Sequence, residues 1–132
     1  MCDVNFNIPI GIVGREELIV SNNDTASKYG SGLIDVLATP AMIGLMEKTA
    51  MNSINTFLPN DYITLGIEVN VSHIKATPVG MKVFSESKLI KVVGKKLFFE
   101  VNAWDENGQI GFGNHTRYIV NKLKFIEKLK KG

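Results

Sequence analysis

The sequence has 132 residues, of which 45% are hydrophobic and 21% are charged, as in an ordinary soluble globular protein. This length predicts a single domain over residues 1–132, large enough to bury a core without disulfide bonds. The net charge of +2 gives no strong attraction to nucleic acid. The lysines gathered after residue 121 are interpreted as a solvated helix face.

Cys2 is the sole cysteine, which excludes an internal disulfide bond and a multi-cysteine metal site. A single cysteine also fits a reducing compartment. No basic region precedes the first apolar residues, and the apolar run at 8–13 is short and interrupted by Pro9 and Gly11. We therefore expect no signal peptide, no membrane span and a cytoplasmic location.

The first twenty residues contain one candidate strand, placed either at 8–13 or at 17–20. Residues 21–24 read Ser-Asn-Asn-Asp, which is turn composition. The segment 25–38 then passes through Tyr29-Gly30-Ser31-Gly32. Its glycines indicate either a plain loop or a mobile lid over a pocket.

Residues 39–58 are predicted to form one long helix. Thr39 is a candidate N-cap, Pro40 suits the first helical position, and Pro59 ends the run. At about 100° per residue, a set of apolar side chains shares one stripe of this helix: Ile43, Met46, Ala50, Met51, Ile54, Phe57 and Leu58.

Glu47 falls near the middle of that stripe and is the most informative residue of the chain. Burying an unpaired charge is very costly. We therefore expect this carboxylate to change its protonation state, to find a partner, or to line a wet cleft.

After the helix, the period of the pattern changes from 3.6 to 2. Apolar and polar residues alternate from Ile63 to His73, which predicts a half-buried strand. Three further strands are predicted at 81–93, 97–105 and 109–120, joined by tight turns at Gly94-Lys95 and at 105–108. The tail 121–132 is expected to be a short helix or a frayed end.

Hairpin links predict an antiparallel sheet. Strands of about nine residues reach ~30 Å, and a helix of about nineteen residues reaches ~28 Å. One sheet can therefore wrap around one long central helix, in an α+β arrangement. Because such a sheet has open edges, we expect a two-fold homodimer with the sheets joined edge to edge.

Three polar residues interrupt this packing pattern: Thr39, Glu47 and His73. Each alone has a structural explanation, as an N-cap, a carboxylate paired with a lysine, and a satisfied core or edge histidine. Together they supply a hydroxyl, a carboxylate and an imidazole, the groups that acyl-transfer chemistry uses. Gly66, inside a strand, indicates either close approach of a ligand or another chain, or a β-bulge.

Three separated blocks of the sequence stand out together: residues 38–47, residues 65–67 with 71–81, and residues 111–117 followed by Lys124-Phe125. They resemble the fluoroacetyl-CoA thioesterase type of the hotdog-fold acyl-CoA thioesterases. The likeness covers roughly residues 33–126, nearly the whole domain. Any one block alone would be a weak signal, whereas three in the same order are specific.

The resemblance implies a hotdog dimer, or a dimer of dimers, that hydrolyses small acyl-CoA thioesters without a metal or a cofactor beyond the CoA of the substrate. By position, Thr39, Glu47 and His73 match the catalytic triad of that family. Gly66 matches a backbone contact near the thioester carbonyl. Arg117 matches a residue near the active site or the CoA.

One segment departs from the family. Members selective for fluoroacetyl groups carry bulky aromatic residues before the catalytic threonine, whereas residues 30–33 here read Gly-Ser-Gly-Leu. Leu33 is the only candidate for an apolar gate, so the resemblance does not fix the acyl group. No catalytic role is predicted for His115, which is expected at the surface or in support of another site residue.

Three other interpretations compete with a hydrolase. The first is a non-catalytic module that binds a CoA-like or apolar ligand in the same cleft. The second is a hotdog dehydratase, which would also need an acid and a histidine, although the spacing matches the thioesterases better. Nucleic-acid binding by the lysine-rich tail is least favoured, because Phe125 is the only aromatic residue among those charges.

Overall fold

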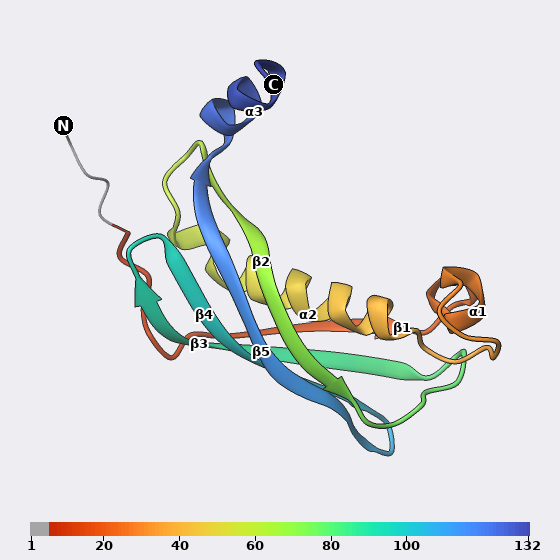
Figure 1. The fold of residues 1–132 in the computed structure, drawn as a ribbon. Coiled ribbons are helices and arrows are strands. Elements are labelled where there is room, and N and C mark those ends of the chain that lie inside the picture. Colours follow the sequence, from red (N-terminus) through yellow and green to blue (C-terminus); the bar gives the residue numbers. More distant parts are fainter. Residues whose placement is uncertain (1–5) are drawn as a thin grey trace.

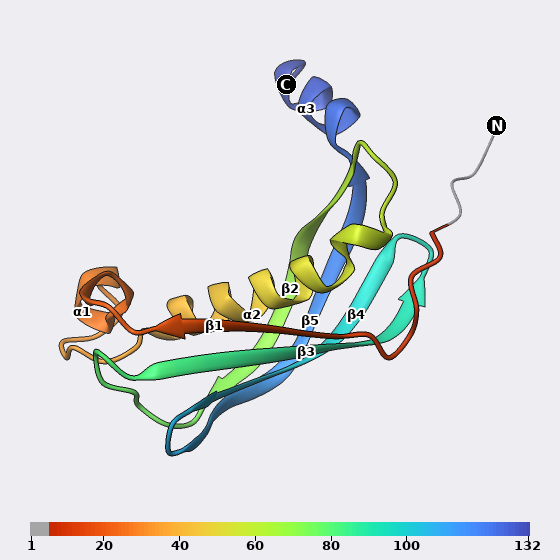
Figure 2. The same ribbon diagram turned by 180° about the vertical axis from the view of Figure 1, so that it is seen from behind.

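A computed structural model describes residues 6–132, and Cys2 lies outside the described residues. Within them, five strands form one antiparallel sheet in the order β1-β3-β4-β5-β2. The strands are β1 (Val13–Ile19), β2 (Tyr62–His73), β3 (Lys82–Val93), β4 (Lys96–Asp105) and β5 (Gly108–Asn121). The predicted antiparallel sheet wrapped around one long helix is confirmed (Figures 1 and 2).

The predicted strands and hairpins lie close to their observed positions. The hairpins β3–β4 and β4–β5 turn at Gly94 and Gly108, where positive φ values of 59° and 141° suit glycine. The first strand starts at Val13, so the candidate at 8–13 was wrong and the candidate at 17–20 overlaps the observed strand. β2 pairs with β5 and has no second neighbour among the described strands, which makes it an edge of the sheet.

The helix α2 (Thr39–Ile54) lies across the concave side of the sheet and continues as a 3₁₀ turn, η2 (Asn55–Phe57) (Figure 1). Pro40 stands in its first turn as expected. The N-cap is Ala38, however, so the assignment of Thr39 as the N-cap was wrong. The Thr39 hydroxyl bonds to a side chain outside the helix instead.

The buried face of α2 is rotated relative to the predicted stripe. Met46, Ala50 and Ile54 are buried as expected, whereas Ile43 and Met51 are half-buried. The rest of the buried face consists of Ala41, Met42, Leu45 and Thr49. Thr49 escaped a pattern based on apolar residues because it is polar, but its hydroxyl donates to the Leu45 carbonyl within the helix at 2.6 Å. Glu47 therefore lies on the flank of the buried face, not in its middle.

Strand β2 changes face at a bulge between Gly66 and Glu68. Before the bulge, Thr64 is buried while Leu65 is exposed, so the polar residue points inward. After the bulge, Val71 packs against the core, as the alternation predicted. The phase predicted for Ile63 and Leu65 was wrong, because one extra residue in a strand reverses the face of every side chain on one side of it.

Two short helical regions complete the chain. A 3₁₀ turn, η1 (Asn22–Asp24), leads into α1 (Ala26–Tyr29), which ends at Gly30 with φ 75°. The C-terminal α3 (Lys122–Lys130) begins at the cap residue Asn121, buries none of its residues and projects from the body (Figure 1). Among the described helices, none combines the length and the apolar character that a membrane span requires.

Candidate active site

The first polar cluster joins the start of α2 to the end of β2. Thr39 Oγ1 lies 2.8 Å from His73 Nδ1, a hydrogen bond between residues that are 34 positions apart. Since a hydroxyl can donate or accept, this bond is compatible with either neutral tautomer of the imidazole. The topology thus brings together two of the three residues predicted for catalysis.

The second nitrogen of His73 is shielded from solvent in the single chain. Nε2 is buried and has no hydrogen-bond partner within residues 6–132. Burial lowers the pKa of His73, and the nearby backbone of Lys75 raises it by a smaller amount. That backbone lies near the ring but does not form a hydrogen bond of normal geometry to Nε2. The neutral ring is therefore favoured near pH 7, which suits a proton acceptor or a neutral donor.

A cavity of about 560 Å³ borders this cluster. Thr39 and His73 form part of its wall, together with Gly32 and Ile34 from the segment before α2 and Ile74 and Lys75 from the segment after β2. Ser31 and Gly32, in the glycine-containing approach to the helix, therefore form part of a pocket wall. Leu33 itself is fully exposed (103%) and does not line this cavity; Ile34 does.

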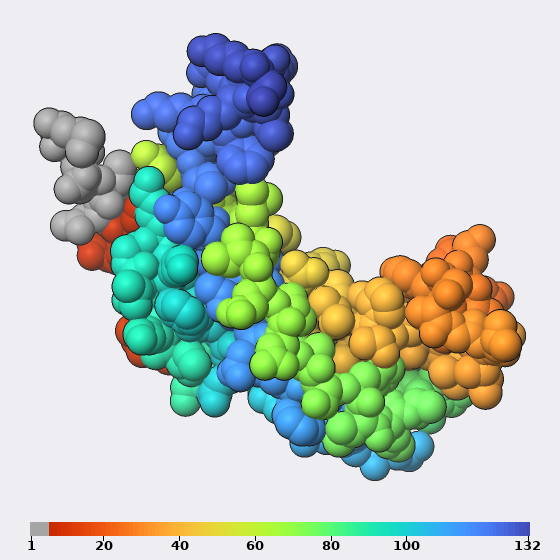
Figure 3. Space-filling view, viewed as in Figure 1, coloured from red at the N-terminus to blue at the C-terminus, as the bar shows by residue number. Residues whose placement is uncertain are grey.

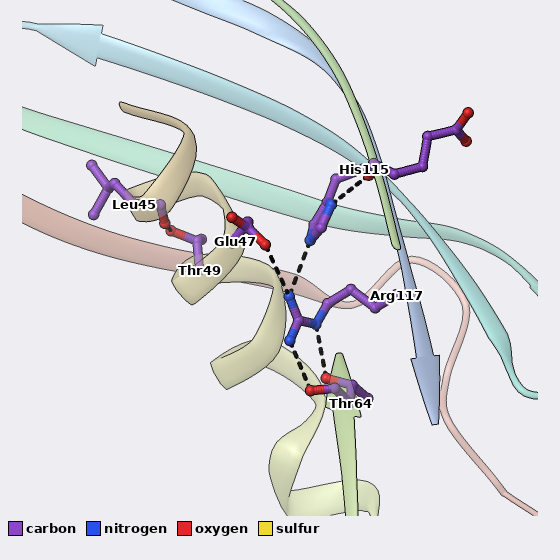
Figure 4. A network of polar contacts seen from close by, with 7 residues as sticks. Leu45, Glu47, Thr49, Thr64, His115 and Arg117 are labelled. Atoms are coloured by element: carbon purple, nitrogen blue, oxygen red, sulfur yellow. Dashed lines mark hydrogen bonds and ion pairs between the residues drawn. The ribbon is translucent and has the colours of Figure 1, made fainter. Parts of the chain in front are cut away.

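The second polar cluster surrounds Glu47 (Figure 4). Glu47 Oε2 lies 3.9 Å from Arg117 Nη1, an ion pair in which the Arg117 side chain is buried and that of Glu47 is 40% exposed. A Cβ atom built on Gly66 would lie only 2.5 Å from the same carboxylate oxygen. Of the three expected outcomes for Glu47, the structure therefore has the charged partner, and the close approach at Gly66 is made by the Glu47 side chain.

Arg117 is held from two further sides. Its Nε donates to Thr64 Oγ1 at 2.8 Å and its Nη2 donates to the Thr64 carbonyl at 2.9 Å. Its Nη1 lies 3.1 Å from Nε2 of His115, which is buried. The surface alternative for His115 was wrong, whereas the other alternative, a position beside another site residue, is the one observed. Thr64 was not among the predicted site residues.

A sequence signal for this cluster was present. His115, Arg117 and Ile119 follow one another at a spacing of two along β5, and Ile119 belongs to the core. A strand places such residues on one face. The alternation therefore places two basic side chains on the buried face, where each needs a partner.

One chain does not bring the two clusters together. Thr39 and Glu47 are eight residues apart on the same helix, which separates them by about 12 Å along its axis. Figure 3 shows the yellow residues of α2 between the green strand β2 and the orange α1 region, so the sheet leaves this side of the helix uncovered.

Within residues 6–132, no group of three or more His, Cys, Asp or Glu side chains is arranged to hold a metal ion.

Comparison with known proteins gives one consistent family. The model of the family described as fluoroacetyl-CoA-specific thioesterase matches residues 20–123. The fluoroacetyl-CoA thioesterase of Streptantibioticus cattleyicolor is 34% identical over 96 residues, which cover 73% of this chain and 69% of that protein.

Solved structures agree. A variant of the fluoroacetyl-CoA-specific thioesterase FlK, determined with fluoroacetate and CoA, has a TM-score of 0.85 at 29% identity and covers 89% of this chain and 99% of its own. A hot-dog-like protein from Thermanaerovibrio acidaminovorans has a TM-score of 0.88 at 22% identity, over 97% of this chain and 96% of that one, and shares the fold. The chain therefore belongs to the fluoroacetyl-CoA-specific thioesterase family and has its hotdog fold.

Proposed function

We propose that this protein is an acyl-CoA thioesterase that hydrolyses a small acyl thioester to the free acid and the CoA thiol. The observation that carries the proposal is the hydrogen bond between Thr39 and His73 at the wall of a cavity, with the second imidazole nitrogen unpartnered among the described residues. A hydroxyl, an imidazole and a carboxylate are the groups that activate water and stabilise the charge of an acyl-transfer intermediate.

Glu47 is the proposed base or nucleophile. In the first route, its carboxylate takes a proton from water while the water oxygen adds to the thioester carbonyl carbon; the C–S bond then breaks, and protonated Glu47 returns the proton to the CoA sulfur. In the second route, the carboxylate itself adds to that carbon and expels the thiolate; water then hydrolyses the resulting anhydride, and a proton from that water converts the thiolate to the thiol. Both routes use the same atoms of this chain and give the same products.

The other residues support these steps. His73 is proposed to orient water or to donate to the developing oxyanion, and Thr39 to hold His73 in place. The backbone N–H of Gly66, or of the first turn of α2, is the proposed oxyanion donor, which is worth roughly 3–4 kcal/mol when aimed correctly. Arg117 fixes the carboxylate or contacts the CoA. No metal or separate cofactor is needed for this chemistry.

A second copy of the chain is proposed to complete the site. Thr39 and Glu47 of one chain are too far apart to act on one carbonyl carbon, because a reacting group must lie within hydrogen-bond reach or one water molecule of it. β2 is an edge strand that carries Gly66 near its middle and His73 at its end, and it exposes Leu65 and Ile67. In the proposed dimer, two β2 strands pair antiparallel about a two-fold axis, in a register that brings the Gly66 region of one chain beside His73 of the other.

The acyl group is proposed to be small, with Leu33 and Ile34 near the entrance. Residues 30–33 offer two glycines and no aromatic ring, so this segment lacks a rigid apolar lid over the acyl group. We therefore do not restrict the substrate to fluoroacetyl-CoA.

A hydrolysis panel tests the proposal. Purified protein is incubated with acetyl-, fluoroacetyl-, propionyl-, butyryl- and longer acyl-CoAs, and the released thiol is measured, with Glu47→Gln as the matched variant. Turnover of a short member that Glu47→Gln lacks supports the hydrolase. Tight binding of acyl-CoA without thiol release by the wild type would establish the alternative, a non-catalytic CoA-binding module.

A further inference from the structure

His115 is a buried imidazole to which the proposed reaction has so far given no part. It lies on β5 opposite Val69 of β2 and stacks on Phe99 of β4, with ring centroids 6.3 Å apart. Both of its nitrogens have partners: Nδ1 lies 2.8 Å from the Glu68 carbonyl oxygen, and Nε2 lies 3.1 Å from Arg117 Nη1. The β2 bulge between Gly66 and Glu68 occurs at this point of the strand.

These two partners fix the tautomer of the ring. A carbonyl oxygen only accepts hydrogen bonds, so the proton must be on Nδ1. A guanidinium only donates, so Nε2 must present its lone pair to Arg117. A doubly protonated ring would point an N–H group at the N–H of Arg117 and add a second positive charge beside it.

The surroundings of the ring agree with a neutral state. Burial lowers the pKa of His115 and the positive charge of Arg117 lowers it further, against the opposing effects of the Glu68 carbonyl and the Glu47 charge. These are the charged and hydrogen-bonding groups that face the ring from α2, β2 and β5; from β4, the ring meets the apolar face of Phe99.

The same contact decides where the Arg117 guanidinium lies. Thr64 holds Nε and Nη2, and His115 holds Nη1, the nitrogen that is nearest to Glu47 (Figure 4). The Glu47 side chain is 40% exposed, and its carboxylate, 3.9 Å from Arg117 Nη1, is too far away to accept a hydrogen bond from it. Packing around the Glu47 side chain therefore does not by itself fix the position of the carboxylate. The position of the charge opposite that carboxylate is therefore set by His115 and Thr64.

We propose that neutral His115 is a positioning residue, which accepts a hydrogen bond from Arg117 and thereby holds the guanidinium against Glu47 for thioester hydrolysis. The inference rests on the proposed function for its catalytic part. Its structural part, the Nδ1–H tautomer and the contact with Arg117, does not depend on that function.

Two substitutions separate the two ring nitrogens. In His115→Gln, the amide oxygen can replace Nε2 as the acceptor for Arg117, whereas the bond to the Glu68 carbonyl is lost. In His115→Asn, the amide nitrogen can replace Nδ1 as the donor to Glu68, whereas the acceptor for Arg117 is lost. The two variants are matched in chemistry, and each removes one of the two contacts.

If His115 positions Arg117, kcat of His115→Asn falls about 10- to 100-fold with KM little changed, because a misplaced reacting group affects the chemical step. His115→Gln then keeps a kcat within a few-fold of the wild type. Equal activities of the two variants, or the opposite order, would overturn the proposal. If His115 were only structural, activity would depend on the bond to the Glu68 carbonyl, which His115→Asn keeps and His115→Gln loses.

Nitrogen-15 NMR of the wild-type imidazoles tests the structural part without relying on a variant that folds. The protein has only two histidines, so His73→Gln assigns the signals. We expect a protonated Nδ1 and an unprotonated Nε2 for His115 at pH 7, and an Nε2–H tautomer or a protonated ring would overturn the proposal. Wild-type protein that releases no thiol from any acyl-CoA would instead overturn the proposed function and the catalytic part, whatever the tautomer.

Discussion

The carboxylate of Glu47 occupies space that any side chain at position 66 would need. Its Oε2 lies 2.5 Å from the point where a Cβ on Gly66 would stand, and the His115 ring and the Arg117 guanidinium are also within contact distance of that point. A glycine in the middle of a strand usually destabilises the strand. Here it lets a carboxylate on the central helix approach the backbone of the edge strand.

Gly66→Ala is therefore expected to displace the Glu47 carboxylate. Because Gly66 does not have a left-handed backbone conformation, the substitution acts through the carboxylate and not through backbone strain. We expect kcat for acyl-CoA hydrolysis to fall about 10- to 100-fold, as for a reacting group moved by about 1 Å. Steady-state kinetics measure the loss of activity, and thermal unfolding measures any change in stability separately.

Gly44→Ala is the matched control. A Cβ on Gly44 meets nothing within 4 Å among the described residues, and Gly44 lies on the exposed side of α2. The helix should gain up to about 1 kcal/mol of stability, with activity unchanged. Equal loss of activity in both glycine variants would argue against the contact at Gly66.

Glu47→Gln tests the carboxylate itself. The amide keeps the size of the side chain but can neither take a proton from water nor attack the thioester carbon. We expect the variant to fold as the wild type and to lose at least about 100-fold in kcat, the usual range for a general base. Unchanged turnover would remove Glu47 from the mechanism.

Mixing two inactive variants tests whether the site is shared between two copies. In a dimer of one Glu47→Gln chain and one His73→Ala chain, a shared site combines the intact His73 of one chain with the intact Glu47 of the other. Because half of randomly mixed dimers are mixed and one of their two sites is intact, about a quarter of the wild-type activity should return. No recovery after unfolding and joint refolding would indicate that each chain carries a complete site.

The acid side of the pH profile should report His73. Burial lowers its pKa, so the neutral ring that the mechanism uses persists below the ordinary imidazole value of about 6.5. We therefore expect kcat/KM to be level near pH 7 and to fall with a midpoint below about 6.5 as His73 becomes protonated. An NMR titration of His73 should give the same midpoint, and a midpoint above the ordinary value would contradict this assignment.

Asp105 links the segment after His73 to the β4–β5 turn. Its buried carboxylate accepts hydrogen bonds from Lys75 Nζ at 2.9 Å, from Thr77 Oγ1 at 2.9 Å and from the Asn107 backbone N–H at 2.8 Å. Burial alone would raise the pKa of Asp105, but these hydrogen bonds and the charge of Lys75 lower it overall.

Because the folded-state pKa of Asp105 is lowered, its stabilising effect is present above its unfolded-state pKa of about 3.9 and is lost as the pH falls through the folded-state value. Asp105→Asn should reduce the free energy of unfolding by about 1–3 kcal/mol at pH 7. The difference in the free energy of unfolding between Asp105→Asn and the wild type should narrow below about pH 4. Denaturant unfolding at several pH values measures this gap.

Glu106→Gln provides a control for that measurement, since Glu106 is exposed and accepts one bond from the Lys82 backbone N–H at 2.9 Å. Its effect on stability should be smaller than that of Asp105→Asn. A gap for Asp105→Asn that stays constant down to pH 3 would show that the carboxylate charge does not contribute.

The sequence by itself determined the order of the elements, the family and the residues to examine. A period of 3.6 before Pro59 and a period of 2 after it are local properties of the chain, so the long helix and the four strands that follow could be placed to within a few residues. The polar residues Thr39, Glu47 and His73 were conspicuous because they interrupt these patterns.

Only the tertiary structure decided how those residues are grouped. Periodicity does not record a bulge, so the exchange of faces in β2, which turns Thr64 and Gly66 toward Glu47 and Arg117, was not visible in the alternation. The rotation of α2 likewise depends on which side chains the curved sheet can accept. The contact between Thr39 and His73 joins a helix to a strand, and the contact between Arg117 and Thr64 joins two strands. Both form only when the sheet assembles around the helix.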